Sequence, residues 1–113
     1  MASLNKVQLI GYVGGEPKIT AFEGGGKSAQ FSLATTERAY TAKSGAQVPE
    51  RTEWHNIVLY NGLADVAAQY VHKGTLLYVE GKLHTRSYTN QETHYVTEVI
   101  VDNMQMLSKQ ESF

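Results

Sequence analysis

The residue best placed for specific chemistry in this sequence is its single tryptophan, Trp54, in the stretch TEWHNIVLY of residues 52–60. The two-residue period of a strand puts Trp54 and Tyr60 on one side, and Ile57 and Leu59 on the other. At the usual rise per residue the two rings lie about 20 Å apart. Such rings can stack on a flat partner, pack against a second subunit or cover the mouth of a barrel, and the spacing alone leaves these alternatives open.

Residues for catalysis or metal binding are sparse. The chain has no cysteine and no GxSxG motif, and its only aspartates, Asp65 and Asp102, fall in separate elements. His84 and His94 would face each other if the last hairpin turned near Thr89, but no third ligand and no HExxH motif accompanies them. We therefore expect no enzyme activity, no metal site and no cofactor.

Composition narrows the class of protein. A chain of 113 residues without cysteine suits a single domain in a reducing compartment. Residues 1–20 lack a signal-peptide pattern, and no apolar run approaches the ~20 residues that span a bilayer, so we expect a cytoplasmic protein without membrane contact. Ten Lys and Arg against eleven Asp and Glu leave the charge near zero. A polyanionic partner would therefore have to be held by local features.

The elements that must position Trp54 are mostly strands. Residues 5–15 alternate like a strand that bends or ends at Gly14 and Gly15, and residues 18–37 read as a hairpin with its tip at residues 24–26. In the second arm of that hairpin, alternation turns Ala29, Phe31 and Leu33 to one face. Residues 36–52 carry little apolar periodicity, so they are expected to form a long exposed loop.

A helix of about three turns is predicted after residue 61. Leu63, Val66, Ala67 and Tyr70 recur at helical spacing, and Gly74 stands where a C-cap would fall. Tyr70 and Tyr78 are expected to be packing residues.

Residues 75–107 then read as a long hairpin that turns at TNQE. Five strands with one helix between the third and fourth match the all-β OB-fold, a five-stranded Greek-key barrel. We expect residues 1–107 to form this domain and residues 108–113 to be a short disordered end.

Several blocks of the sequence carry a resemblance to a known family. NKVQLIG, FSLATTE, TEWHNIVLYNGLADVAAQYVHKG, LYVEGKLHTRSY and TEVIVDNMQML resemble, in order and spacing, the corresponding blocks of the bacterial single-stranded DNA-binding proteins. The resemblance covers nearly all of residues 4–107. It implies an OB-fold protomer that assembles into a homotetramer, or a dimer, and binds single-stranded DNA without reading its sequence. The setting implied is replication, recombination and repair at the bacterial nucleoid.

The same resemblance implies site residues. The family's base-stacking aromatics correspond to Trp54, Tyr60, Tyr88 and Tyr40, and stacking is tolerant of sequence because every base has a flat face. His55 corresponds to a position near the subunit contact. Candidate phosphate-binding cations, from family position or placement in a loop, are Lys6, Arg38, Lys43, Arg51, Lys73, Lys82 and Arg86.

Protein partners form a separate expectation. Family members typically continue into a disordered region with an acidic tip that recruits replication and repair proteins, whereas this sequence stops at SKQESF. Whether replication and repair proteins are recruited through a tail is left open, because a trimmed chain, a short paralogue from a mobile element and a protein that does not recruit through its tail would all end in this way.

Overall fold

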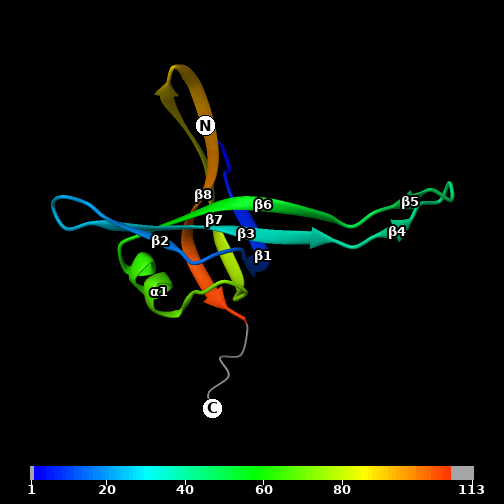
Figure 1. The fold of residues 1–113 in the computed structure, drawn as a ribbon, viewed down its shortest axis with the longest axis horizontal. Coiled ribbons are helices and arrows are strands. Elements are labelled where there is room, and N and C mark those ends of the chain that lie inside the picture. Colours follow the sequence, from blue (N-terminus) through cyan, green and yellow to red (C-terminus); the bar gives the residue numbers. More distant parts are fainter. Residues whose placement is uncertain (1, 108–113) are drawn as a thin grey trace, which may run out of the picture.

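The computed structural model describes residues 2–107, which form a strongly curved sheet with one helix and three projecting hairpins (Figure 1). A six-stranded sheet has the order β1-β7-β8-β6-β3-β2, and an additional pairing of β1 with β3 brings the ends of the sheet together. No helix in the described part of the chain is long and apolar enough to cross a bilayer. The elements are β1 (Val7–Val13), β2 (Lys18–Ala21), β3 (Lys27–Glu37), β4 (Tyr40–Thr41), β5 (Gln47–Val48), β6 (Arg51–Tyr60), α1 (Gly62–Tyr70), β7 (Leu76–Asn90) and β8 (Glu92–Met106).

The topology is that of the predicted OB-fold. β1 and β2 are two halves of one strand, because β1 pairs mainly with β7 and β2 pairs with β3 on the far side of the interruption at residues 14–17. Counted this way there are five barrel strands, with α1 between the third (β6) and the fourth (β7). A parallel pairing of β6 with β8 completes the ring. Gly11 permits the crossing of β1 over β3, because a Cβ there would overlap the carbonyl oxygen of Ala34.

The barrel interior is filled by the inward sides of the strands, as the alternation predicts. Ala29 and Leu33 of β3 and Leu59 of β6 have no exposed surface, and Ile57 has almost none. Removing such side chains from water is the main stabilising term of the fold. The buried cluster comprises Val13, Ala29, Phe31, Leu33, Ile57, Leu59, Ala64, Ala67, Val71, Leu77, Val79, Val99 and Val101.

The helix differs from its prediction in two details. Its buried residues are Ala64 and Ala67, while Tyr70 is exposed, so the expectation that Tyr70 is a packing residue is wrong. Small side chains let α1 approach the barrel closely, which turns the larger Tyr70 outward. Gly74 is not the helix cap either, because α1 ends at Tyr70 with Val71 as its C-cap. Gly74, at φ +90°, instead forms the turn before β7 and donates its N–H to the carbonyl of Val13 at 2.8 Å.

Residues 36–52, which were expected to form an exposed loop, form a two-stranded ribbon. The predicted exposure is confirmed, but the predicted absence of strands is wrong. β3 continues to Glu37 and β6 begins at Arg51, opposite it in the ladder, and β4 and β5 extend the pair outward. We call residues 38–50 the β4–β5 arm. Neither face of the arm is buried, so no apolar alternation marks its strands.

The arms make the molecule extended for its size. Its radius of gyration is 16.8 Å, against about 13 Å for a compact domain of this length. The β2–β3 hairpin turns at Gly24 and Gly25, both at positive φ, as the glycine run predicts. The β7–β8 hairpin, whose outer part (residues 84–98) we call the β7–β8 arm, turns at Gln91. The expected disordered end at residues 108–113 lies outside the described residues.

Candidate nucleic-acid interface

One outer side of the sheet brings together several of the predicted site residues. Trp54 is 59% exposed and Tyr60 44% exposed on β6, and Val58 lies between them on the same side. The ladder joins Val58 to Ile100 of β8, and Ile100 to Lys82 of β7. Because alternate residues share a side, this surface continues along the β7–β8 arm. We call it the Trp54 face; it comprises Gln30, Ser32, Trp54, Asn56, Val58, Tyr60, Lys82, His84, Arg86, Tyr88, His94, Val96, Glu98 and Ile100.

The Trp54 ring lies against the backbone at Gly14. A Cβ on Gly14 would overlap the Cζ3 edge of the ring, and would lie 3.2 Å from Oγ of Ser32. The absence of a side chain at Gly14 therefore makes room for the ring, while much of Trp54 stays open to solvent. One edge of the ring therefore lies against the backbone before any partner arrives.

Tyr88 is held in a similar way by a histidine. It lies opposite His94 in the β7–β8 ladder, and the two rings stack with centroids 5.0 Å apart and an interplanar angle of 24°. Tyr88 remains 46% exposed, so it offers a second surface to a flat ligand. The conditional pairing of His84 with His94 does not occur, because the hairpin turns at Gln91 and His84 lies opposite Glu98. Residues 2–107 contain no group of three or more His, Cys, Asp or Glu that could hold a metal ion.

Tyr40 is not brought to the Trp54 face. It lies on β4, in the separate two-stranded sheet of the β4–β5 arm, and is 59% exposed. In Figure 1 this arm and the β7–β8 arm leave the barrel in different directions. Tyr40 is therefore available as a distant platform, and its predicted stacking role remains a prediction.

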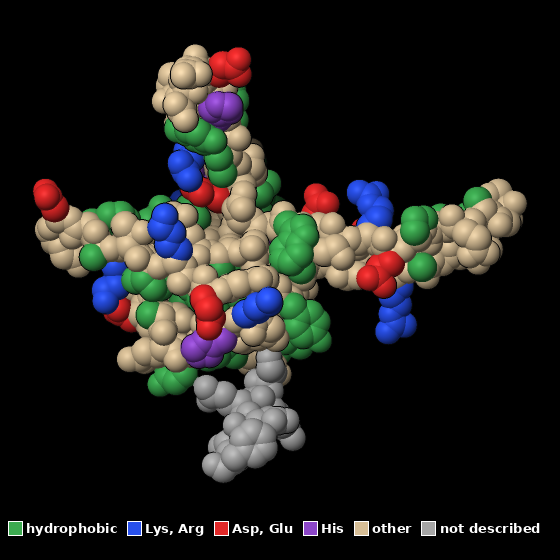
Figure 2. All heavy atoms as spheres, viewed as in Figure 1, with side chains coloured by type: hydrophobic (Ala, Val, Ile, Leu, Met, Phe, Trp, Pro, Cys, Tyr) green, Lys and Arg blue, Asp and Glu red, His purple; other side chains and the backbone are tan. Residues whose placement is uncertain are grey.

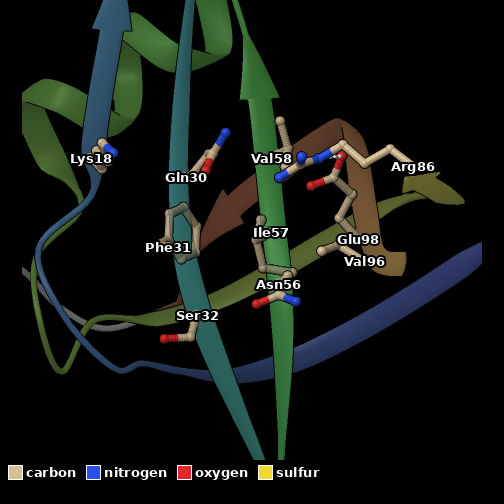
Figure 3. A pocket seen from close by; sticks show the side chains of 10 residues that line it. All are labelled: Lys18, Gln30, Phe31, Ser32, Asn56, Ile57, Val58, Arg86, Val96 and Glu98. Atoms are coloured by element: carbon tan, nitrogen blue, oxygen red, sulfur yellow. Dashed lines mark hydrogen bonds and ion pairs between the residues drawn. The ribbon is translucent and has the colours of Figure 1, made fainter. Parts of the chain in front are cut away.

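A groove of about 290 Å³ lies in the Trp54 face (Figure 3). Val96 supplies apolar surface, Val58 lines the groove although it is only 2% exposed, and Gln30, Ser32 and Asn56 supply hydrogen-bonding groups. Arg86 and Glu98 stand together at one side, where Nε of Arg86 donates to Oε1 of Glu98 at 3.2 Å. A groove with apolar walls, amides and a cation can accept a base and its phosphate.

Apart from Lys73, the predicted phosphate-binding cations fall into three places. Arg86 and Lys82 belong to the Trp54 face, whereas Arg38, Lys43 and Arg51 lie on or at the base of the β4–β5 arm. Lys6 lies apart, because its Nζ is 3.3 Å from Oε1 of Glu80. Figure 2 shows the Lys and Arg side chains scattered singly among acidic ones on the face in view, without a continuous basic patch.

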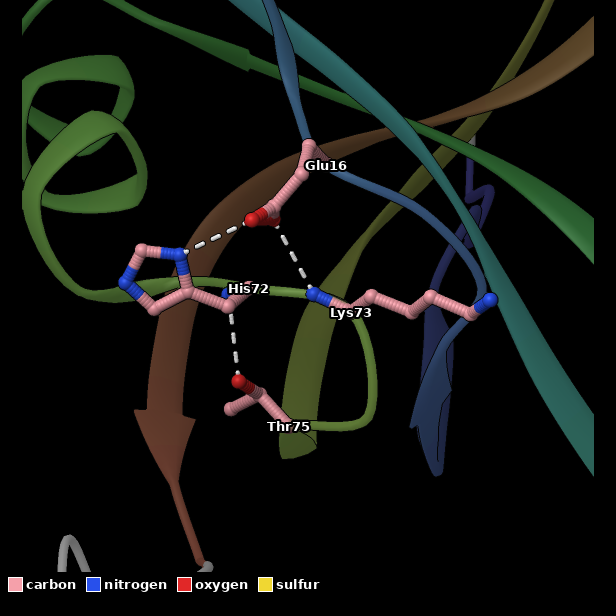
Figure 4. A network of polar contacts seen from close by, with 4 residues as sticks. All are labelled: Glu16, His72, Lys73 and Thr75. Carbon is pink, nitrogen blue, oxygen red and sulfur yellow. Dashed lines mark hydrogen bonds and ion pairs between the residues drawn. The ribbon is translucent and has the colours of Figure 1, made fainter.

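Lys73 lies in a loop that is pinned by polar contacts (Figure 4). Its backbone N–H donates to Oε2 of Glu16 at 3.1 Å, and Oε1 of Glu16 lies 3.3 Å from Nδ1 of His72. The N–H of His72 donates to Oγ1 of Thr75 at 3.1 Å. The side chain of Lys73 extends away from Glu16, so its ammonium remains available to a ligand.

A second surface lies on the outer side of β1 and β7, and we call it the β1 face: Gln8, Ile10, Tyr12, Tyr78 and Glu80. Ile10 and Tyr12 are each 58% exposed. The Tyr78 hydroxyl donates to Oε2 of Glu80 at 2.6 Å, and the amide of Gln8 donates to the Tyr78 oxygen at 3.1 Å. The hydrogen bond from Tyr78, then the contact with Lys6, lowers the pKa of Glu80, and the same carboxylate raises the pKa of Tyr78.

His55 is half-buried on the side of β6 opposite Trp54. Its Nε2 lies 2.9 Å from Oγ1 of Thr35, which fixes the ring. No described contact joins His55 to the Trp54 face, so a role in assembly rather than ligand binding remains its prediction.

Two charged groove residues were not among the predicted site residues. Lys18 of β2 and Glu98 of β8 both line the groove. Lys18 sits beside Gln30 in the ladder, and a strand register is needed to place it there. Glu98 was overlooked because one acidic residue in an alternating strand reads as solvent-facing, although it is only 5% exposed.

Comparison with known proteins shows the family of the chain and agrees with its fold. Residues 4–107 match the single-strand binding protein family, and the chain belongs to that family. The single-stranded DNA-binding protein of Bacteroides thetaiotaomicron is 56% identical over 108 residues, which cover 94% of this chain and 67% of that protein. Single-stranded DNA-binding protein 1 of Xylella fastidiosa is 41% identical over 113 residues, covering 98% of this chain and 82% of that protein.

A solved structure is similar in fold as well as in sequence. The Plasmodium falciparum SSB in complex with ssDNA superposes with a TM-score of 0.87 at 38% identity, covering 96% of this chain and 98% of that chain. The OB-fold predicted from the strand order is therefore confirmed.

Proposed function

We propose that this chain binds single-stranded DNA without reading its sequence and protects it during replication, recombination and repair. The observation that carries the proposal is the exposure of Trp54, Tyr60 and Tyr88 on one sheet face of a single-strand binding family member. Bases of any sequence can stack on such rings. The Xylella and Bacteroides relatives are named as single-stranded DNA-binding proteins, and the Plasmodium neighbour is a complex with ssDNA.

Stacking supplies most of the binding free energy in this proposal. Each base–aromatic stack is worth ~1–3 kcal/mol by alanine substitution. The formal net charge is −1, and cations are few on the Trp54 face, so each protomer displaces few counterions. Arg86, Lys82 and Lys18 then guide the backbone along the sheet. Tyr40, Arg38, Lys43 and Arg51 extend the path along the β4–β5 arm, and Lys73 extends it past the end of α1.

The proposed form is a homo-oligomer, a homotetramer by resemblance, with a dimer as its first unit. β1 pairs with β7 along Val7–Tyr12, and on its other edge it pairs with β3 only at Tyr12 and Val13. An open strand edge beside the exposed Ile10 and Tyr12 suits a second copy of the chain. His55 is proposed to contribute near this contact.

The proposed setting is the bacterial cytoplasm, at the nucleoid, where single-stranded intermediates arise. The chain acts there by binding and not as an enzyme.

Fluorescence anisotropy with labelled oligonucleotides tests the proposal. We expect oligo-dT and mixed-sequence single strands to bind with affinities within a few-fold of each other, and duplex DNA to bind far more weakly because its bases are already stacked. Equal affinity for duplex DNA, or a strong preference for one sequence, would contradict it.

A further inference from the structure

We propose that Glu98 is a positioning residue, which holds Arg86 across the groove so that its guanidinium meets a DNA phosphate. This inference rests on the proposed function. It concerns the one feature of the Trp54 face that is unfavourable for DNA binding on charge alone, a carboxylate in the wall of the groove.

The geometry ties the two side chains together. The Glu98 side chain is 6% exposed and that of Arg86 is 47% exposed, and the bond between them runs from Nε of Arg86 to Oε1 of Glu98 at 3.2 Å. Arg86 lies opposite Val96 in the ladder and Glu98 lies opposite His84, so the pair is diagonal across the β7–β8 arm. In Figure 3 the Arg86 side chain reaches over the groove toward Val58, with Glu98 beside it.

The carboxylate engages only part of the guanidinium. Arg86 makes no other ion pair among residues 2–107, and its side chain lines the groove and is 47% exposed. The terminal N–H groups of a guanidinium have the planar arrangement that matches phosphate oxygens. Glu98 therefore holds the Nε side of the guanidinium and leaves the two terminal nitrogens of Arg86 to bind phosphate.

Two opposing effects decide what Glu98 does to affinity. Its charge repels phosphate, which on its own would make removal of the charge tighten binding. Without Glu98, Arg86 becomes mobile and must be ordered when DNA binds, at an entropic cost that corresponds to roughly 2- to 12-fold in affinity. If positioning dominates, neutral substitution weakens binding, so the two effects differ in sign.

The first test compares Glu98→Gln with wild type for binding of labelled oligo-dT at several salt concentrations. Glutamine keeps the shape of the side chain and removes its charge. We expect affinity to fall by about 2- to 12-fold. Glu53→Gln is the control for net charge, because Glu53 is an exposed carboxylate on the other side of β6 and contacts neither groove nor Arg86; it should bind as tightly as wild type or more tightly.

A double-mutant cycle tests the dependence on Arg86. Arg86→Gln should weaken binding and lower the salt slope. In the Arg86→Gln background, Glu98→Gln should cause no further loss, because the group that it positions is gone. Glu98→Asp keeps the charge but shortens the side chain, and should also bind DNA more weakly. It replaces Glu98→Gln in the binding test if a thermal melt shows that Glu98→Gln is not folded.

An NMR readout is independent of DNA. The Nε–H signal of Arg86 should be protected from solvent exchange in wild type and less protected in Glu98→Gln, because a neutral amide oxygen accepts a weaker hydrogen bond from the guanidinium than a carboxylate does. Unchanged or tighter oligo-dT binding by Glu98→Gln would overturn the inference, as would a loss that persists in the Arg86→Gln background. A loss confined to oligo-dC or oligo-dA would also overturn it, because Glu98 would then accept a hydrogen bond from a base amino group. Failure of wild type to bind oligo-dT would instead overturn the proposed function.

Discussion

The support beneath the Trp54 ring is what distinguishes it from an ordinary exposed aromatic residue. A ring that is already seated on Gly14 loses little conformational freedom when a base stacks on it. Tyr88 likewise lies against a neighbouring side chain, the ring of His94. At the residue scale, the affinity of the Trp54 face should therefore depend on small neighbours as well as on the rings.

Gly14→Ala should weaken binding of single-stranded DNA several-fold without unfolding the protein. The new Cβ overlaps the far edge of a side chain, so the Trp54 ring shifts while the backbone stays in place. Trp54 emission should change in the free protein. Gly15→Ala is the matched control, because a Cβ at Gly15 meets nothing within 4 Å; equal effects of the two substitutions on DNA affinity would contradict the proposed seat.

Tyr88→Ala should cost about 1–3 kcal/mol in binding free energy, to a similar extent for every single-stranded sequence. The control is Tyr95→Ala, since Tyr95 is 74% exposed on the other side of the same arm. Anisotropy titrations of both variants give the comparison. Equal losses from the two substitutions would mean that the stacking surface is not specific to the Trp54 face.

At the scale of elements, burial on one side decides what the sequence can predict. The barrel strands alternate because one side is packed, so β3 and β6 and their inward residues were predicted correctly. The β4–β5 arm buries neither side, and the same reasoning took it for a loop. The contact between Arg86 and Glu98 was not predicted, because it depends on the register of β7 against β8, including a shift at Glu80 and Gly81, which local sequence does not encode.

The β1 face predicts a pH dependence. The pKa of Glu80 lies below its ordinary value of 4.5, so its contribution to the free energy of unfolding is present above that pH and is lost as pH falls through the folded-state pKa. Tyr78→Phe removes the hydrogen bond that contributes most to this shift. We expect Tyr78→Phe to be less stable than wild type at neutral pH, with a difference that shrinks in acid.

Denaturant unfolding near neutral pH and well below pH 4.5 measures that difference. A difference in the free energy of unfolding between wild type and Tyr78→Phe that stays constant or grows in acid would contradict the claim that Tyr78 lowers the pKa of Glu80. The pKa of Tyr78 is raised, so Tyr78 makes a second pH-dependent contribution to the free energy of unfolding. That contribution is present below pH 10.0 and is lost as pH rises through the folded-state pKa.

For the whole molecule, the arms and the open edge of β1 argue against an isolated protomer. Light scattering of the wild-type protein should give a multiple of the 12.5 kDa chain mass. Ile10→Asp should lower that mass, because it places a charge in the exposed β1 face. Phe22→Asp, at an exposed apolar residue on the β2–β3 hairpin, should leave the mass unchanged. The same low mass for wild type, Ile10→Asp and Phe22→Asp would refute assembly through the β1 face.

Titration of Trp54 fluorescence with oligo-dT tests the central claim most directly, because Trp54 is the only tryptophan in the chain. We predict saturable quenching by oligo-dT and by mixed-sequence single strands at similar concentrations, as bases stack on the ring. Emission that stays unchanged at low salt, while anisotropy shows the DNA to be bound, would contradict the account.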